Sequence, residues 1–351
     1  MNAIVKSAKR KVRSLLKRAQ TLVIRTASRS RIGSTLYYAF EGSFGREHRA
    51  TLAGKVMYRE SVTRPQGTSS LLRRNVHRIE KGLIMRPRRT PFGLNYIKET
   101  VDAYVAACRA NVDTAELAWA RDVLSEYMSV NPPHPVIDPL RDAVVSIGDP
   151  APAESRATRR TPYRRDPSQA PSISYDEFLK LARFRRSVRW FLPKAVPRDA
   201  IEKAVVVAGY SPSACNRQPY QFRVFDDPEL VRQVIELPMG TGGFGHQVPA
   251  VAVVVGRQRS YFSERDRHLI YIDGALASMS FVYALEVQGL GSCCINWPDV
   301  ESREAKMAKL LKLAPDERPI MLIAIGYPDP DGSVPHSVKK SVASVCRFNF
   351  E

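Results

Sequence analysis

The segment 184–191, FRRSVRWF, gathers three guanidinium groups and one hydroxyl within five residues. These side chains belong to Arg185, Arg186, Ser187 and Arg189. Arginine presents paired N–H donors that match the oxygens of a phosphate, so the segment could bind a phosphate group. A solvated surface run of arginines has the same composition. The segment alone leaves both interpretations open.

A second polar segment is SPSACNRQPYQF, at 211–222. It places neutral hydrogen-bonding side chains on a turn that Pro212 and Pro219 stiffen. Such groups suit a flat heterocycle with alternating N–H and C=O edges, a ligand that needs direction without charge. An ordinary turn of Ser, Pro and Asn uses the same residues. This segment by itself does not decide between a binding site and a plain turn.

Two further segments could complete a site. In LEVQGLGSCCINW, at 285–297, Gly289 and Gly291 end a predicted helix, where they either let the backbone approach a ligand or form a helix C-cap. The pattern is not GxGxxG, and no acidic residue follows at the spacing of a dinucleotide site. Lys339 and Lys340, later in the chain, are a basic pair suited to an anion.

The elements that must position these segments begin at residue 173. Ser174 and Glu177 have the spacing of a capping box and predict a helix that leads into the arginine segment. Further helices are predicted over 196–210, 227–237, 267–290 and 302–313, and strands over 220–225, 249–256 and 318–329. The stretch 291–297 is predicted to be a strand or a loop. Because helices and strands mix without a βαβ repeat, we expect an α+β fold and not a doubly wound parallel sheet.

The order of these segments resembles that of the nitroreductase family of FMN-dependent oxidoreductases. The shared features are RRSVRxF, then P-S-x-x-N-x-Q-P, a long helix ending in GLGS, and a lysine-bearing terminal segment. VPAVAVVVG and RPIMLIAIGYPD also resemble that family's buried strands. The resemblance covers roughly residues 173–350 and implies a mixed or antiparallel sheet flanked by helices. Residues 1–172 look like an added N-terminal region.

The resemblance also implies which residues bind FMN. The arginine segment would hold phosphate and ribityl oxygens, and the polar turn would lie against the ring, commonly from the other subunit of a homodimer. Residues 294–297 would bring backbone N–H groups near the reactive flavin nitrogen, Gln247 would offer an amide to the ring, and the lysine pair would contact phosphate. The predicted cofactor-binding residues are Arg185, Arg186, Ser187, Arg189, Pro212, Ser213, Ala214, Asn216, Gln218, Gln247, Gly291, Ile295, Asn296, Lys339 and Lys340.

The activity implied by the resemblance is that of an oxidoreductase. NAD(P)H would reduce the flavin and leave, and a small organic acceptor would then accept hydride. No protein nucleophile is required, so no catalytic residue and no metal ligand is predicted. His246, His268 and His336 are expected to be ordinary loop or surface histidines. A hypothesis of another class is a degenerate flavin fold that serves as an anion-binding adaptor through the basic N-terminal half.

Three departures from the family pattern bear on the substrate. The bulky Trp297 follows GLGS and could narrow the pocket over the flavin. Arg217 lies within the polar turn, where it would face solvent or recruit an anionic substrate. The segment 258–268, where the family places its substrate-gating helices, is short and charged. We therefore do not expect broad nitroaromatic reduction to follow directly from FMN binding.

The net charge of +19 is unevenly placed, because residues 1–40 hold ten Lys or Arg and no acid. Apolar residues at helical spacing within 4–26 predict either a basic amphipathic helix on an anionic membrane surface or a solvated, partly disordered tail. Nucleic acid is not expected, since no recognised motif accompanies the charge. No apolar run reaches the length of a membrane span, and we see no secretory signal. Five cysteines without CxxC fit reduced thiols in a cytoplasmic protein, or one peripheral to a membrane.

Four parts are predicted along the chain: a basic leader at 1–68, a helical region at 69–147, a Pro/Ser/Arg-rich linker at 148–172 and the FMN-binding domain at 173–351. The helical region contains LLRRNVHRIEKGLIMRPRRTPFG, dense in basic residues. It is either an anionic-substrate site, with His77 and Glu80 as an acid–base pair, or a basic helix that packs on its own chain. Gly82 is predicted to follow the helix end, at C′.

Overall fold

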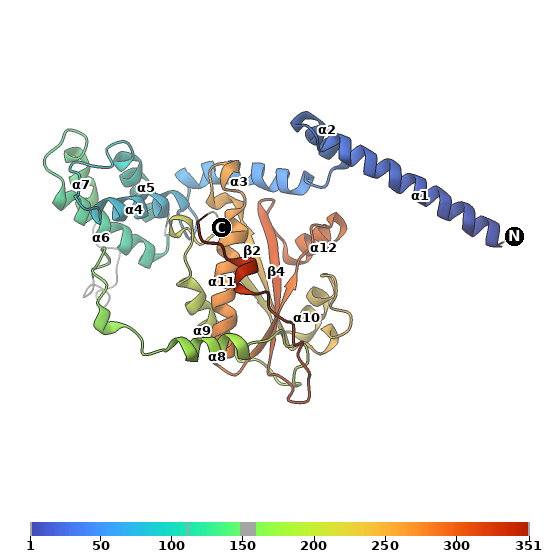
Figure 1. Cartoon of the computed structure of the whole chain (residues 1–351). Coiled ribbons are helices and arrows are strands. Elements are labelled where there is room, and N and C mark those ends of the chain that lie inside the picture. Colours follow the sequence, from blue (N-terminus) through green and yellow to red (C-terminus); the bar gives the residue numbers. More distant parts are fainter. Residues whose placement is uncertain (1, 111, 148–158, 350–351) are drawn as a thin grey trace. The chain divides into compact units, whose positions relative to one another are not determined.

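A computed structural model describes residues 2–110, 112–147 and 159–349 (Figure 1). Contacts divide the chain into two compact units, Met1–Arg49 and Ala50–Glu351. The first holds α1 (Asn2–Ala27), α2 (Arg31–Glu41) and the start of α3 (Gly45–Thr63). The predicted N-terminal helix is confirmed. From residue 5 to residue 49, all of which the structure describes, no side chain is buried, so this unit has no apolar core.

The division into units lies inside the stretch 1–68 that the sequence groups as one leader. Ala50, Thr51, Gly54 and Tyr58 of α3 are buried, which ties the second part of that helix to the larger unit. Of the predicted linker, residues 148–158 lie outside the described residues. Its described part contains the short turn η2 (Pro167–Gln169).

The larger unit is built on a four-stranded sheet of β1 (Tyr220–Phe225), β2 (Ala250–Arg257), β3 (Gly291–Asn296) and β4 (Glu317–Gly326). The strand order is β1-β2-β4-β3, and every neighbouring pair is antiparallel. This confirms the α+β fold with an antiparallel sheet. The central strands β2 and β4 read as continuous apolar runs because they are covered on both faces.

Alternate residues of β2 enter two different cores. Val251, Val253 and Val255 pack with α10 (Pro228–Ile235) and α12 (Glu301–Leu311). Ala250, Ala252 and Val254 pack with α9 (Arg198–Gly209) and α11 (Leu269–Glu286). The two-residue period of a strand sends successive side chains to opposite faces, and Figure 1 shows helices on both sides of the sheet.

The stretch Glu264–Glu286, which includes α11, is the one helix in the described part of the chain that is long and apolar enough to cross a membrane. This differs from the prediction that no apolar run reaches such a length. Half of the most apolar part of this stretch is buried, and α11 packs on α9 and β2. A single helix of this kind is weak evidence for a span, because the core helix of a soluble protein passes the same test.

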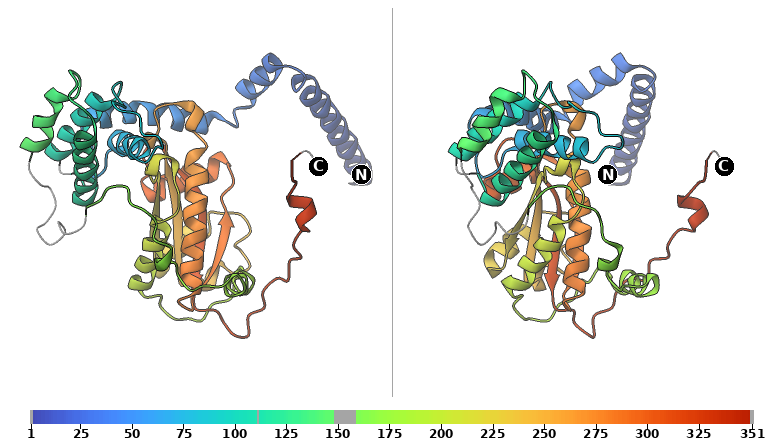
Figure 2. Two further views of the ribbon diagram at one scale, coloured as in Figure 1. Left: turned by 60° about the vertical axis from the view of Figure 1, so that its left-hand side comes forward. Right: turned by 90° about the vertical axis from the view of Figure 1, so that its left-hand side faces the viewer.

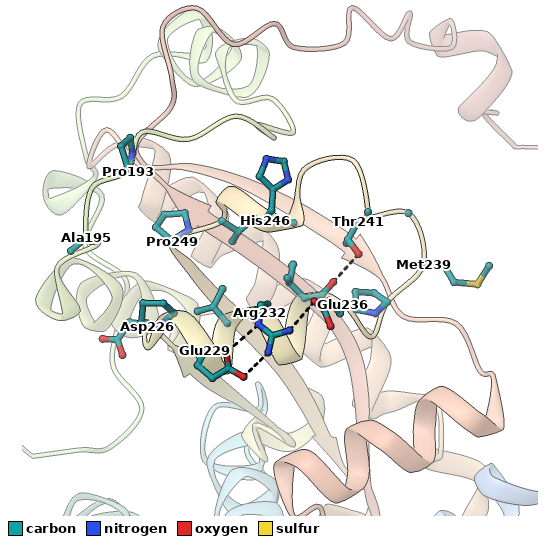
Figure 3. A pocket seen from close by; sticks show the side chains of 18 of the residues that line it. Pro193, Ala195, Asp226, Glu229, Arg232, Glu236, Met239, Thr241, His246 and Pro249 are labelled. Atoms are coloured by element: carbon teal, nitrogen blue, oxygen red, sulfur yellow. Dashed lines mark hydrogen bonds and ion pairs between the residues drawn. The ribbon is translucent and has the colours of Figure 1, made fainter.

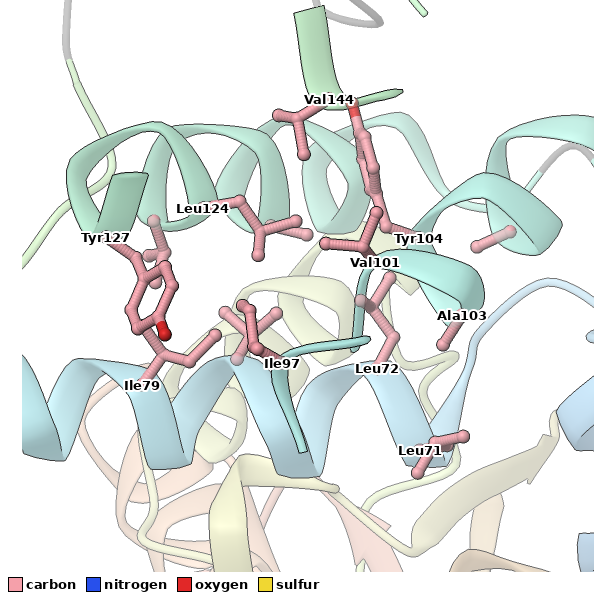
Figure 4. Close-up of a cluster of buried hydrophobic side chains, with 14 of the residues drawn as sticks. Leu71, Leu72, Ile79, Ile97, Val101, Ala103, Tyr104, Leu124, Tyr127 and Val144 are labelled. Carbon is pink, nitrogen blue, oxygen red and sulfur yellow. The ribbon is translucent and has the colours of Figure 1, made fainter. Parts of the chain in front are cut away.

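The helical region consists of α4 (Ser70–Leu83), α5 (Ile97–Arg109), α6 (Thr114–Val130) and α7 (Asp138–Ser146). Figure 4 shows their shared core, where Leu72 and Ile79 of α4 meet Ile97, Leu124 and Tyr127. These five side chains are fully buried. The region therefore has its own hydrophobic core, as a helical subdomain requires.

The predicted C′ position of Gly82 is wrong. The helix α4 continues through Gly82 to Leu83, and its C-cap is Ile84. A Cβ at residue 82 would lie 2.1 Å from the ring of Phe92. Glycine is required here because an aromatic ring packs against the helix backbone, and this contact cannot be read from the local pattern.

Candidate functional site

The arginine segment runs beside β3. It follows α8 (Tyr175–Phe184), whose predicted capping box between Ser174 and Glu177 is present. Ser187 forms a parallel bridge with Ser292, and the Val188 N–H donates to the Ser292 carbonyl at 3.0 Å. The segment thus adds a short extended stretch to the edge of the sheet. This pairing fixes the register of its backbone relative to β3.

Three predicted phosphate-binding side chains act on one point of β3. Burial raises the pKa of the Cys293 thiol, and the Arg189 charge, a Ser187 hydrogen bond and the Arg185 charge oppose this rise. The hydroxyl of the neighbouring Ser292 is buried and has no hydrogen-bond partner among the described residues. The structure therefore places the charges of Arg185 and Arg189 and the hydroxyl of Ser187 close to Cys293, whereas the Ser292 side chain belongs to the opposite face of β3.

The same positive patch influences an acid at the end of α11. Burial raises the pKa of Glu286, and the charge of Arg185 lowers it. The side chain of Arg186 is engaged with the neighbouring backbone, because its Nη1 donates to the Arg185 carbonyl at 3.1 Å.

Gln247 holds the arginine segment in place. Its Oε1 accepts from the Phe191 N–H at 2.7 Å, and its Nε2 donates to the Arg189 carbonyl. Both ends of the amide therefore bind backbone of the chain itself. This assigns Gln247 a positioning role on the segment, and its predicted contact with a flavin ring stays a prediction.

Gly291 lets the arginine segment pack closely against β3. A Cβ on this residue would lie 2.8 Å from Pro328 Cγ and 2.9 Å from Val188 Cγ2. The close approach that the glycine permits is thus to the chain's own side chains. The side chain of Ile295 is buried in the sheet's core, whereas Asn296 is exposed.

The two predicted phosphate lysines lie elsewhere. Lys339 and Lys340 are exposed in the extended segment after β4 that ends in the single helical turn α13 (Val342–Val345) (Figure 2). Their predicted contact with a phosphate stays a prediction.

The polar turn after α9 has an unusual backbone. It contains η3 (Ala214–Asn216), and Cys215, Asn216 and Gln218 have φ values of 54°, 51° and 47°. Such left-handed conformations are uncommon in residues other than glycine and persist where surrounding contacts enforce them. Inside the turn, Ser213 Oγ accepts from the Gln218 N–H at 3.1 Å, and Gln218 Nε2 donates to the Gly209 carbonyl at 2.9 Å.

Asp273 of α11 holds the turn from below. This carboxylate is 3% exposed, and its Oδ2 accepts from the Ala214 N–H at 3.0 Å and from the Tyr261 hydroxyl at 2.8 Å. Burial and the nearby Asp273 raise the pKa of Tyr261, so its hydroxyl stays a donor. The hydrogen bond between Ala214 and Asp273 fixes the position of the turn relative to the long helix α11.

The expectation that Arg217 faces solvent is wrong, and its recruitment of an anionic substrate stays a prediction. Arg217 is 8% exposed and donates to the carbonyls of Ala214 and Ser260 at 3.1 and 3.0 Å. Its guanidinium lies 4.3 Å from the ring centroid of Tyr261. The charge is used inside the fold, because the turn's carbonyls and an aromatic face surround it.

Helix α4 contacts the turn from a third side, which the sequence did not reveal. Arg73 Nε donates to the Asn216 carbonyl at 2.7 Å, and its Nη1 pairs with Glu116 Oε2 at 3.0 Å. Glu116 is 5% exposed and also accepts from Thr68 Oγ1 and the Ser69 N–H. A buried carboxylate therefore orients Arg73 toward a residue with a left-handed backbone. Density of basic residues in 71–93 was the only signal for this contact.

Other basic side chains of α4 also pack on the chain. Arg74 pairs with Glu99 at 3.4 Å, and Arg78 lies 3.7 Å from the ring centroid of Tyr96. His77 Nδ1 and Glu80 Oε2 are 3.5 Å apart, and Glu80 also accepts from the Trp119 indole. These contacts favour the interpretation of α4 as a helix that packs on its own chain.

Helices α3 and α4 contact the segment 258–268. Lys55 bonds Glu264, and a Cβ on Gly54 would lie 2.5 Å from Gln258 Cβ. Arg74 lies 5.2 Å from the ring centroid of Phe262. Helices from the N-terminal region therefore contact the first part of the segment where the family resemblance suggested substrate-gating helices, and most residues after Tyr261 remain exposed.

A cavity of about 1050 Å³ opens beside the end of the arginine segment (Figure 3). It is lined by 193–195, α10 and the loop 236–249. His246 at its edge contacts Trp190 edge-on, with ring centroids 6.3 Å apart. Arg232 in its wall pairs with Glu229 and Glu236, so the acids and base of this wall largely neutralise one another.

Trp297 does not narrow a pocket, contrary to expectation. It is 6% exposed and belongs to the core between the sheet, α10 and α12. Its indole N–H donates to Glu304 Oε1 at 2.6 Å. The side chain after β3 thus points into the interior, where α12 supplies its partner.

Comparisons with known proteins match the part of the chain that holds these segments. The model of the nitroreductase family matches residues 182–242 and 233–327. The chain is 25% identical over 197 residues to an iodotyrosine deiodinase of Haliscomenobacter hydrossis, covering 48% of this chain and 87% of that protein. It is 29% identical over 157 residues to a putative NADH dehydrogenase/NAD(P)H nitroreductase of Archaeoglobus fulgidus, covering 44% and 86%.

Among solved structures, an FMN-dependent nitroreductase of Clostridium difficile is similar to 49% of this chain over 99% of its own length. Its TM-score is 0.43 at 21% identity. The residues matched by the family model include the arginine segment, the polar turn and all four strands of the described sheet, whereas residues 1–181 lie outside the match.

Proposed function

We propose that residues 182–327, which the model of the nitroreductase family matches, form a domain that binds FMN and uses NAD(P)H to reduce a small organic acceptor. The observation that carries the proposal is that the arginine segment lies along the edge strand β3, where Ser187 bridges Ser292 and the Val188 N–H donates to the Ser292 carbonyl. Burial raises the pKa of Cys293 on this strand, and the charges of Arg189 and Arg185 and a Ser187 hydrogen bond oppose this rise. Guanidiniums and hydroxyls are the groups that bind a phosphate and its attached polyol.

The residues fit FMN in chemistry as well as in charge. Arg185, Ser187 and Arg189 would hold the phosphate end, and the polar turn around Asn216 would hold the uncharged ring edge. FMN, when bound, supplies the hydride and electron chemistry. The chain's part is to bind and orient: Asp273 and Arg217 fix the turn's backbone so that its donors and acceptors need little rearrangement to meet a ligand.

We further propose a homodimer with FMN at the interface. Exposed aliphatic side chains on α9 and α11 support it, including Val206 at 63% and Ile272 at 51% exposure. The segment after β4 also exposes Val338 and Val342. A second copy of the chain would cover these apolar surfaces, which is the usual reason for such patches on an enzyme.

The chemical class of the acceptor is the next part of the proposal. Several relatives are named iodotyrosine deiodinases and others putative NAD(P)H nitroreductases. We therefore propose to compare nitroaromatic, quinone, enone and iodotyrosine acceptors.

The first test is the visible absorption spectrum of the purified full-length chain. We expect a yellow protein that releases FMN on heating and oxidises NADH or NADPH when an acceptor is added. A colourless protein that also fails to take up added FMN would contradict the proposal and favour the anion-binding adaptor. A yellow protein that oxidises neither NADH nor NADPH would support FMN binding but contradict NAD(P)H as the reductant.

Replacing Arg73 by methionine tests whether α4 supports the flavin site. The change keeps much of the side chain's volume but removes the hydrogen bond to the Asn216 carbonyl. We expect FMN affinity to fall about tenfold, the usual value of one hydrogen bond from a charged donor. Flavin fluorescence titration measures the affinity.

Two matched variants separate positioning from general stability. The double variant Arg73→Met with Glu116→Gln removes the unpaired buried charge, so it should regain thermal stability but keep the weaker FMN binding. Arg74→Met on the same helix serves as the control. If Arg73→Met binds FMN as tightly as this control does, α4 does not position the turn.

A further inference from the structure

The helix α1 carries a continuous exposed apolar stripe. At roughly 100° per residue, eight apolar side chains fall within an arc of about 120° on one side of the helix, and the exposed Ile24 is an exception on the opposite side. The stripe consists of Val5, Ala8, Val12, Leu15, Leu16, Ala19, Leu22 and Val23. Leu15, Leu16 and Leu22 are 64%, 64% and 67% exposed.

The rest of the helix surface is basic. Eight Lys or Arg lie within α1, and the first acid of the chain is Glu41. By the same angular count, Arg10, Arg13 and Lys17 lie opposite the stripe, whereas Lys9 and Lys11 border it. A helix with an apolar arc bordered by cations has the form of one that lies in a lipid–water interface.

The unit that contains α1 does not stabilise it by burial. No residue from 5 to 49, all within the described chain, is buried, although α1 contacts α2. Helices in proteins owe most of their stability to packing of an apolar face, and nothing in this unit buries that face. A free α1 would therefore be marginal in water, and an apolar partner is needed to hold it.

The charges distinguish among possible partners. In a pair of α1 helices joined along the stripe, Lys11, Arg18 and Arg25 would flank the seam in both copies with no acid to pair with them. A nucleic acid would match the charge but leave the apolar arc in water. We propose that α1 docks the protein on an anionic lipid bilayer, with the stripe among the acyl chains and the cations at the head groups.

The test is sedimentation of the full-length chain with vesicles of phosphatidylcholine containing about 30% phosphatidylglycerol. We expect most of the protein to sediment with them at about 0.1 M salt and much less at about 0.5 M, because salt screens the head groups. Vesicles of phosphatidylcholine alone should bind at least about tenfold less, since each basic residue near an anionic surface adds affinity.

Matched triple variants identify the face that binds. Leu15→Gln, Leu16→Gln and Leu22→Gln together remove the centre of the stripe and should lower partitioning at least about tenfold. The control is Ser7→Gln, Ser14→Gln and Thr21→Gln, which places the same residue three times on the basic side and keeps every charge. This control should bind as the unchanged chain does.

The other outcomes overturn the proposal. A chain that stays in the supernatant with anionic vesicles at low salt has no such surface. Salt-independent binding to neutral vesicles would remove the role of the cations. Light scattering that shows self-association abolished by the three leucine changes would assign the stripe to a second copy. The flavin content of each variant should stay unchanged, so these results do not depend on the proposed enzyme activity.

Discussion

Replacing Arg185 and Arg189 together by alanine is expected to yield a folded protein that no longer retains FMN. Both guanidinium charges lie close enough to the Cys293 thiol of β3 to oppose the rise in its pKa that burial causes. Each hydrogen bond to a charged phosphate oxygen contributes roughly 1.5–3 kcal/mol, so losing two should weaken FMN binding at least about a hundredfold. The measurement is the ratio of visible flavin absorbance to protein, followed by FMN titration.

The double variant should stay folded, because the hydrogen bonds that hold the backbone of the arginine segment remain. Gln247 binds the Arg189 carbonyl and the Phe191 N–H, which are main-chain groups that alanine retains. The control is Arg183→Ala, which removes an exposed arginine from the end of α8. The proposed phosphate site is wrong if the double variant keeps its flavin as well as the control does. Lysine at residue 189 should restore part of the affinity, since it keeps the charge without the paired donors.

Replacing Glu304 by alanine is expected to produce the largest loss of stability among the changes considered. Glu304 is 2% exposed, accepts from the Trp297 indole at 2.6 Å and pairs with Arg318 at 3.2 Å. Arg318 is itself 2% exposed, and two of its nitrogens have no partner among the described residues. Removing the acid leaves a buried cation whose remaining ion pair is with the exposed Asp299, which should lower the free energy of unfolding by about 3–5 kcal/mol.

Urea denaturation of the purified chain measures this loss. The matched control is Glu229→Ala, which removes an acid from the exposed pair with Arg232 and should leave stability nearly unchanged. Glu304→Gln should fall between the two, because the amide oxygen still accepts from the indole. A Glu304→Ala variant as stable as the Glu229→Ala control would show that this buried network contributes little.

The sequence by itself determined the elements and the segments that carry the proposed chemistry. The capping box of α8, the strands β1 to β4 and the helices that alternate with them all lie within a few residues of their predicted bounds. These features depend on local rules, such as apolar period, cap residues and buried runs. The resemblance to a known family likewise depended on residue order, which needs no knowledge of contacts.

Only the tertiary structure decided what individual side chains within those segments contact. Arg217 and Trp297 both looked like groups facing a substrate, and both proved to be buried with partners from elsewhere in the chain. Gly82 looked like a helix end, but it accommodates the ring of Phe92. In each case the deciding neighbour comes from a separate element, so no local pattern could identify it.

The contact between α4 and the polar turn shows the reason most clearly. Arg73 and Asn216 are separated by 143 residues, yet a hydrogen bond of 2.7 Å joins them. The sequence indicated a basic helix and a polar turn, and it offered a separate function for each without connecting the two. That the helix supports the turn depends on how α4 packs against the sheet domain, because buried partners such as Glu116 direct the guanidinium to one carbonyl.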